Sequence, residues 1–295
     1  MKIRAEVCHF LKSLNAIGLS LIVAAGAITA CSQAEFTKSP DPVGGSGMTP
    51  PTPPPGGGGP GICIPGGGGT PRNGLVGRLY YLNDNQPRYQ QAMQYIQHGQ
   101  LVPNPLFLNH LNVPTVRFER GFVYDGGQAL NRQDGQRLTS FFGMQLWSAI
   151  QLNGTNPTGN YQLAVISDDG AVFTIREGST DSVILNNDGY NSSRLRCATR
   201  PVAFDAATKL PMRLEYFQGP PTHISLVFMW RPWPADGNWR DPLCGMQGDE
   251  FFFDYTQTPS QPTVNYNDLL SRGWRPLDPS NFVLPDGYTN PCNDD

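Results

Sequence analysis

The chain has 295 residues, a net charge of −3 and a pI of about 5.8, and only 15% of its residues are Asp, Glu, Lys or Arg. No cluster of Lys and Arg is interleaved with aromatic residues, so we expect no nucleic-acid partner. Low charge combined with 11% aromatic residues and 33 glycines is typical of a β-rich module exported from the cytoplasm.

Residues 1–30 have the features of a secretory signal, because basic residues precede an apolar segment, 16–30, that ends in small residues. This segment is shorter than a membrane span of about 20 apolar residues. Residues 28–31 (ITAC) resemble the lipobox of bacterial lipoproteins, which implies that Cys31 carries the lipid, including palmitate, and becomes the mature N-terminus. Ser32 after it favours the outer membrane by the same resemblance. The alternative is an ordinary cleaved signal.

Residues 31–73 are expected to form the lipid anchor and a tether rich in Pro and Gly. A stretch with so little apolar content cannot bury enough surface to offset the entropy lost on ordering. A spacer of this kind suggests a domain that is displayed away from the membrane surface and faces outward from the cell.

The segment 160–176 is the most strongly patterned part of the chain. Apolar residues alternate with polar ones on both sides of Asp168-Asp169-Gly170, and such alternation around Asp-Gly predicts a β-hairpin. Two adjacent carboxylates repel each other unless they are solvated or share a cation. The segment therefore predicts either a solvated turn or a cation site.

The remaining elements are short. Strands are expected at 74–82, 115–119, 141–152, 183–186, 199–204, 211–217 and 222–230, and a short helix at 86–97. Many short strands separated by Gly, Pro and Asn predict an all-β fold, a β-sandwich over residues 74–256. Residues 257–295 are expected to be an irregular C-terminal extension, with one or two helical turns at 265–272.

Four segments follow one another in an order that resembles a known family: 159–163 (GNYQL), 167–170 (SDDG), 213–217 (RLEYF) and 226–230 (LVFMW). They are similar to the PA-14 domain, named after anthrax protective antigen. The resemblance covers roughly residues 75–239 and implies a β-sandwich that often recognises carbohydrate. In lectin-like members, acids matching Asp168 and Asp169, joined by a cis peptide, bind calcium. An Asn and backbone carbonyls of a later loop complete the site, and sugar hydroxyls coordinate the metal.

Calcium takes six to eight oxygen ligands at about 2.3–2.6 Å, more than Asp168 and Asp169 supply. We expect the missing oxygens to come from Asp236 and Asn238, which follow the strand that finishes at Trp230. The alternative is that Asp168 hydrogen-bonds the turn backbone while Asp169 is solvated.

The contacts to a bound sugar are expected from two loops. Trp233 and Trp239 would stack on a pyranose face, because aromatic residues commonly anchor ligands. Asn187 and Asp188 are a second candidate for polar ligand contacts and metal oxygens. The alternative for the two Trp side chains is packing in the core or at its rim.

Four cysteines remain once the signal and Cys31 are set aside: Cys63, Cys197, Cys244 and Cys292. In an exported chain they predict two disulfides with three possible connectivities. We favour Cys197–Cys244 and Cys63–Cys292. The alternatives are free thiols or a metal site, although no Cys-x-x-Cys spacing is present.

The sequence predicts a non-catalytic protein. Its histidines are scattered, no Gly-x-Ser-x-Gly occurs, and adjacent acids do not give the separation of about 5–10 Å that glycosidase chemistry needs. We expect an adhesin-like lipoprotein anchored in the outer membrane, with a calcium-dependent site for a cell-surface or extracellular glycan. The alternative is a structural or protein-interaction module of the envelope without metal.

Overall fold

The computed structural model describes residues 47–50, 62–64, 72–122, 129–132 and 134–290. All of them belong to one unit, Gly44–Asp295. The predicted signal, the anchor at Cys31 and residue Cys292 lie outside the described residues.

The strands are β1 (Ile62–Ile64), β2 (Leu75–Tyr81), β3 (Gln100–Leu101), β4 (Leu106–Leu108), β5 (Asn112–Arg117), β6 (Phe142–Ile150), β7 (Gly159–Asp168), β8 (Ala171–Glu177), β9 (Thr180–Asn186), β10 (Arg194–Cys197), β11 (Val202–Phe204), β12 (Leu210–Gln218), β13 (His223–Pro232), β14 (Phe253–Asp254), β15 (Gln261–Pro262), β16 (Arg275–Pro276) and β17 (Phe282–Val283). The helices are α2 (Ala92–His98) and α3 (Val264–Ser271), with 3-10 turns η2 (Phe118–Arg120) and η3 (Pro279–Asn281). None of the helices in the described ranges is long and apolar enough to cross a membrane.

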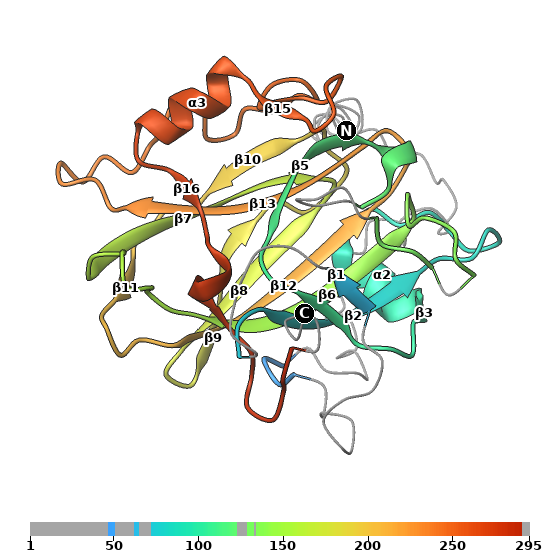
Figure 1. Ribbon diagram of the computed structural model, residues 1–295, viewed down its shortest axis with the longest axis horizontal. Helices are drawn as coiled ribbons and strands as arrows, with labels where there is room; N and C mark the ends of the chain where they lie inside the picture. The colour runs from blue at the N-terminus through green and yellow to red at the C-terminus, as the bar shows by residue number, and fades with distance from the viewer. Residues whose placement is uncertain (1–46, 51–61, 65–71, 123–128, 133, 291–295) are drawn as a thin grey trace, which may run out of the picture. The chain divides into compact units, whose positions relative to one another are not determined.

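Two sheets form the body of the domain (Figure 1). Among the described residues, sheet A has nine strands in the order β1-β4-β2-β6-β12-β8-β9, with β17 beside β6 and β3 beside β2. Sheet B has six strands in the order β10-β7-β13-β16, with β11 beside β7 and β5 beside β13. Apart from the parallel pair β1–β4, the pairing in both sheets is antiparallel.

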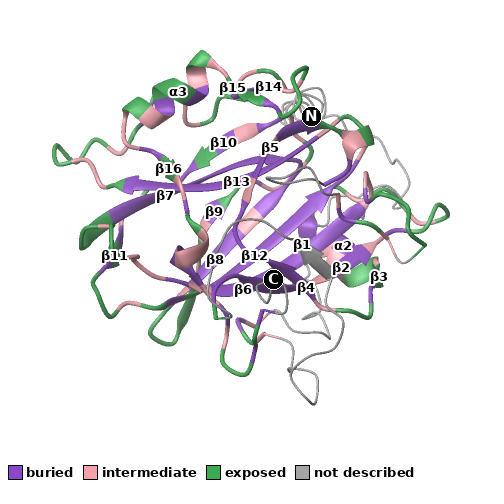
Figure 2. Ribbon diagram, viewed as in Figure 1, coloured by how far each residue is buried: buried purple, intermediate pink, exposed green. Residues whose placement is uncertain are grey.

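The main core lies between the two sheets, and the strands that enclose it are buried along most of their length (Figure 2). Phe173 of β8 stacks on Phe228 of β13 at a ring-centre distance of 4.4 Å, which joins sheet A to sheet B. Each large apolar side chain buried in this way stabilises the fold by about 1.5–3 kcal/mol. The predicted all-β sandwich with a short helix is confirmed.

The predicted hairpin at 160–176 is wrong in its pairing. Both strands exist, but β7 pairs with β10, β11 and β13 in sheet B, whereas β8 pairs with β9 and β12 in sheet A. Leu163 and Phe173, from the two halves of the segment, enter the same core. Asp168-Asp169-Gly170 is therefore the crossing between the two sheets.

The C-terminal extension is more regular than expected. Helix α3 covers the outer face of sheet B, where Leu269 and Trp274 pack against Ile166 of β7 and Met229 of β13 (Figure 1). Strand β16 then pairs with β13, and β17 pairs with β6. The extension is thus joined to both sheets.

A buried carboxylate, Asp241, fixes this extension to sheet B. It accepts hydrogen bonds from Arg272 at 2.7 and 2.9 Å and from the Trp274 indole at 3.0 Å. It also accepts from Arg231 of β13 at 3.3 Å and from the backbone of Leu243 at 3.0 Å. Burial acts to raise the pKa of Asp241, but hydrogen bonds from Arg272, Leu243 and Trp274, with the charge of Arg272, outweigh it and hold the pKa below the ordinary value.

The predicted disulfide Cys197–Cys244 is confirmed, with a Cα–Cα distance of 5.7 Å. It ties β10 to the loop that leads into the extension. The second predicted pair, Cys63–Cys292, includes a residue outside the described ranges and stays a prediction.

Candidate functional site

Asp168 and Asp169 lie where the chain leaves sheet B for sheet A. Asp168 is the last residue of β7, and Gly170 directly precedes β8. The two acids are joined by a cis peptide bond and are only 1% and 5% exposed. The expectation of a solvated Asp169 is therefore wrong, and two carboxyl groups are buried side by side.

Gly170 follows the acids because no side chain fits at its position. A Cβ there would lie 2.3 Å from the ring of Phe217 and 2.7 Å from Oδ1 of Asp188. Gly219, opposite, is similarly confined, since its Cβ would lie 2.3 Å from the ring of Tyr190. Close packing on both sides thus holds the crossing in place.

Asp169 is held by backbone donors. Its Oδ1 accepts from the N–H of Asn191 at 3.1 Å, and its Oδ2 accepts from the N–H of Gly219 at 2.8 Å. Burial raises the pKa of Asp169 to about 6, although these two hydrogen bonds lower it.

Asp168 is less well satisfied than its neighbour. Its Oδ2 is buried and accepts no hydrogen bond from the described residues. Burial raises the pKa of Asp168 to about 9, and the charges of Asp169 and Asp249 raise it further, whereas hydrogen bonds from Gln218 and the Ser193 backbone lower it. A buried carboxylate oxygen without a donor is costly unless it takes up a proton or a cation.

The loop between β9 and β10 completes the surroundings of the pair. The side chain of Asn187 is already engaged within the fold: its amide donates to Ser167 at 2.8 Å and its Oδ1 accepts from Arg194 at 2.5 Å. Asp188 accepts from the N–H of Ala92 at 3.0 Å, which fixes the start of α2. That contact also explains why the helix begins at Ala92, later than the predicted residue 86.

Asn191 is the residue of this loop that the sequence interpretation missed. Its backbone contacts Asp169, while its side-chain Oδ1 is buried and accepts no hydrogen bond from the described residues. Its side-chain amide donates to the carbonyl of Gly189 at 2.7 Å. The position of Asn191 near the acids follows from the pairing of β10 with the end of β7, and that pairing could not be read from the sequence.

The prediction that Asp236 and Asn238 complete the site is wrong. Strand β13 runs antiparallel to β7, with Ser225 opposite Asp168 and Pro232 opposite Tyr161. The loop after Pro232 therefore lies at the far end of sheet B, about 23 Å from the acids at roughly 3.3 Å per residue. There Asp236 accepts a hydrogen bond from the backbone of Asn238 at 2.9 Å, within their own exposed turn.

Trp233 and Trp239 share this distant location and are half-buried. The backbone N–H of Trp233 donates to the Asn160 carbonyl at 2.7 Å, and the carbonyl of Trp239 accepts from Gln162 at 2.8 Å. Both tryptophans thus belong to the rim of sheet B. They do not flank the acid pair.

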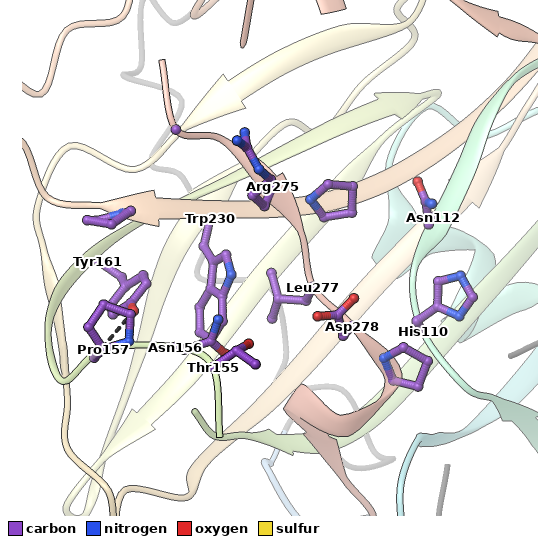
Figure 3. A pocket seen from close by; sticks show the side chains of 14 residues that line it. His110, Asn112, Thr155, Asn156, Pro157, Tyr161, Trp230, Arg275, Leu277 and Asp278 are labelled. Atoms are coloured by element: carbon purple, nitrogen blue, oxygen red, sulfur yellow. Dashed lines mark hydrogen bonds between the residues drawn. The ribbon is translucent and has the colours of Figure 1, made fainter. Parts of the chain in front are cut away.

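A groove also opens at this far end, between sheet B and the C-terminal extension. Figure 3 shows Tyr161 and Trp230 on one side of it and His110 and Asn112 on the other, with Leu277 of the extension between them. Tyr161 is committed to the loop that precedes β7, because its hydroxyl donates to the Pro157 carbonyl at 2.7 Å. The groove is separate from the acid pair.

The residues around Asp168 fit a cation in donor chemistry. Within the described part of the chain no group of three or more His, Cys, Asp or Glu side chains is arranged to hold a metal ion. Two buried carboxyl groups lie here, and the backbone of Asn191 contacts one of them; Oδ2 of Asp168 and Oδ1 of Asn191 are buried and accept no hydrogen bond from the described residues. Hard oxygen donors of this kind suit Ca²⁺, and backbone carbonyls or water would supply the rest.

Comparison with known proteins gives structural neighbours only. No family model matches the sequence, and no curated protein matches it. Among solved structures, the chain is similar to the PA14 sugar-binding domain from an RTX adhesin, at 15% identity and a TM-score of 0.41, covering 54% of this chain and 90% of that one. It is also similar to the PA14 domain of the antifreeze protein MpAFP, at 14% identity and a TM-score of 0.40, covering 59% of this chain and 87% of that one.

A third similar structure is the epithelial adhesin 6 A domain of Candida glabrata in complex with Galb1-3GlcNAc, at 17% identity and a TM-score of 0.38, covering 68% of this chain and 96% of that one. With identities of 14–17% and TM-scores of 0.38–0.41, these similarities assign no function to this chain.

Proposed function

We propose that this protein is a binding module in which Asp168, Asp169 and the side chain of Asn191 hold a calcium ion, and that the ion serves to bind a carbohydrate. The observation that carries the proposal is Oδ2 of Asp168, a buried carboxylate oxygen that lies beside a second buried carboxyl group and accepts no hydrogen bond within the described ranges. A cation would neutralise the charge that burial disfavours. Calcium bound there would supply a Lewis acid able to coordinate vicinal sugar hydroxyls.

The glycan part of the proposal follows the family resemblance and is supported by a neighbouring polar groove. The groove is lined by Arg88, Tyr89, Gln91 and Gln94 on the α2 side and by Asp188 on the loop side. Amide and guanidinium donors beside an aromatic ring are suited to sugar hydroxyls and to the apolar face of a pyranose. Tyr190 connects the two regions, since its hydroxyl donates to the Tyr89 carbonyl at 2.7 Å.

A second function, a protein-interaction module without metal, is favoured by a different observation. The pKa of Asp168 is raised to about 9, so this carboxyl group would be neutral at pH 7 when no cation is bound. A protonated Asp168 would need no metal, and the crossing between the sheets would then be purely structural.

Isothermal titration with calcium distinguishes the two functions. We expect the wild-type protein and Asp286→Asn, a fully exposed carboxylate, to bind calcium equally, and Asp168→Asn to lose binding. Absence of binding in the wild-type protein would remove the calcium claim and leave the interaction module. Glycan arrays probed in calcium and in EDTA then test the carbohydrate claim, which requires a signal that EDTA abolishes.

Export, lipidation at Cys31 and outward display from the outer membrane complete the proposal, and they rest on the sequence features of residues 1–73. Metabolic labelling with a palmitate analogue should mark the wild-type protein and leave Cys31→Ala unlabelled. Equal labelling of both would refute anchoring at this residue.

A further inference from the structure

The loop that carries Asp249, beyond the end of the family resemblance, is attached to the surroundings of Asp168. The N–H of Gly248 donates to the Ser193 carbonyl at 3.1 Å. The Ser193 hydroxyl lies 3.0 Å from that of Ser225, the residue opposite Asp168 on β13. Asp249 therefore follows directly after a residue bonded to the site.

His223 contacts Asp249 from the other side. Its Nδ1 lies 3.0 Å from Oδ2 of Asp249, although this nitrogen makes no hydrogen bond to the described residues. His223 is two residues before Ser225 on β13, so the two side chains share one face of the strand. The imidazole is also packed against the Tyr255 ring at 4.2 Å. Asp249 is thus fixed between two residues that lie next to the register partner of Asp168.

The chain thus places a third carboxylate beside the pair. Ser225 lies opposite Asp168 in the register of β13 against β7, and the Asp249 carboxylate contacts His223 on the same face of β13. Asp168 has a buried Oδ2 that accepts no hydrogen bond from the described residues. The C-terminal part of the chain therefore supplies a third carboxylate on the side of sheet B where β7 ends.

We infer that Asp249 is an affinity-determining residue of the acid site, a third carboxylate whose charge favours a divalent cation there. The inference rests on the proposed cation site and adds that residues beyond the sandwich tune it. Coulomb attraction scales with the product of the charges, so a third carboxylate favours divalent over monovalent cations.

The test measures calcium affinity by isothermal titration and the unfolding temperature in EDTA for the full chain. We expect Asp249→Asn to weaken calcium binding by about tenfold, and Asp249→Glu to restore most of the affinity because it keeps the charge. Glu250→Gln removes the same charge one residue further on, at an exposed side chain, and should leave the affinity unchanged within a factor of about two. The unfolding temperatures of these three variants in EDTA should match that of the wild-type protein.

Each other result decides against a stated claim. If Asp249→Asn binds calcium as tightly as Glu250→Gln while Asp168→Asn does not bind, the role of Asp249 is refuted and the calcium site stands. If Asp249→Asn and Asp249→Glu lose affinity together with unfolding temperature, Asp249 is structural and the inference also fails. If the wild-type protein binds no calcium, the proposed function fails first.

Discussion

Replacement of Asp168 by Asn should stabilise the cation-free protein, by an amount that grows with pH. Because the folded-state pKa of about 9 lies above the ordinary value of 3.8, the folded protein keeps a proton that the unfolded chain has released. The contribution of Asp168 to the free energy of unfolding is therefore fully present below about pH 4 and is lost as the pH rises to about 9. Asn has no proton to lose, so this loss disappears in the variant.

The size of the effect follows from the distance between the working pH and the ordinary pKa. At pH 7 that distance is roughly 3 units, and each unit corresponds to about 1.4 kcal/mol, so the limit is on the order of 4 kcal/mol. We expect about 2 kcal/mol, because the NH2 group of Asn is a donor that must find an acceptor among groups that surround a carboxyl oxygen in the wild-type protein. At pH 5 the gain should shrink below about 1 kcal/mol.

Urea denaturation in EDTA at pH 5, 7 and 8.5 measures this difference in the free energy of unfolding. Asp286→Asn is the matched control: its carboxylate is fully exposed and makes an exposed ion pair with Arg72, so the variant should follow the wild-type curve within about 0.5 kcal/mol at every pH. A gain for Asp168→Asn that is equal at pH 5 and pH 8.5, or a loss at pH 8.5, would refute the buried-charge reasoning. Saturating calcium should reverse the order of stability, since it stabilises only the protein that binds it.

Three further changes test the packing at the crossing between the sheets and the contacts that attach the C-terminal extension. Gly170→Ala should destabilise the protein by about 1–3 kcal/mol in urea, because its Cβ would lie 2.3 Å from the nearest aromatic carbon, whereas Gly154→Ala, in open space, should be close to neutral. Reduction of Cys197–Cys244, which closes 47 residues of chain, should cost about 2–4 kcal/mol by calorimetry, and a reductant should have no such effect on a variant with both cysteines replaced by Ser. Asp241→Asn should cost about 3–5 kcal/mol, since it leaves two arginines without their buried partner; an unchanged unfolding midpoint would contradict the role assigned to that carboxylate.

The faces of the strands could be predicted from the sequence, because alternation reports which side chains are buried. The alternation in 160–176 predicts one apolar face on each strand, and Leu163 and Phe173 on those faces are in the core. Alternation does not report which strand pairs with which, since a strand that turns back into its own sheet and one that crosses to the other sheet present the same pattern. The segment 160–176 shows this limit, because its local signal was that of a hairpin and tertiary pairing separated its halves.

The identity of the acid pair could likewise be predicted, and its neighbours could not. Asp168 and Asp169 stood out as adjacent charges in an apolar pattern. Asn191 and Asp249 come from loops 22 and 80 residues beyond Asp169, and only the register of β7 against β10 and β13 brings them close. Asp236 follows β13 in the sequence, but β13 runs antiparallel to β7, so the end of β13 that leads to Asp236 lies far from the acids.

Residues 72–73 and the last described residues of the domain are tied to each other. The guanidinium of Arg72 donates to the Tyr288 carbonyl at 2.6 Å, and the side chain of Asn290 donates to the Asn73 carbonyl at 3.1 Å. Asn73 donates in turn to the carbonyl of Phe282 in β17 at 2.9 Å. A mechanical pull on the chain at Arg72 would therefore load the extension and β6 first. Tension from that side would be borne by these contacts before it reached the crossing between the sheets, so the acid pair would keep its geometry under load.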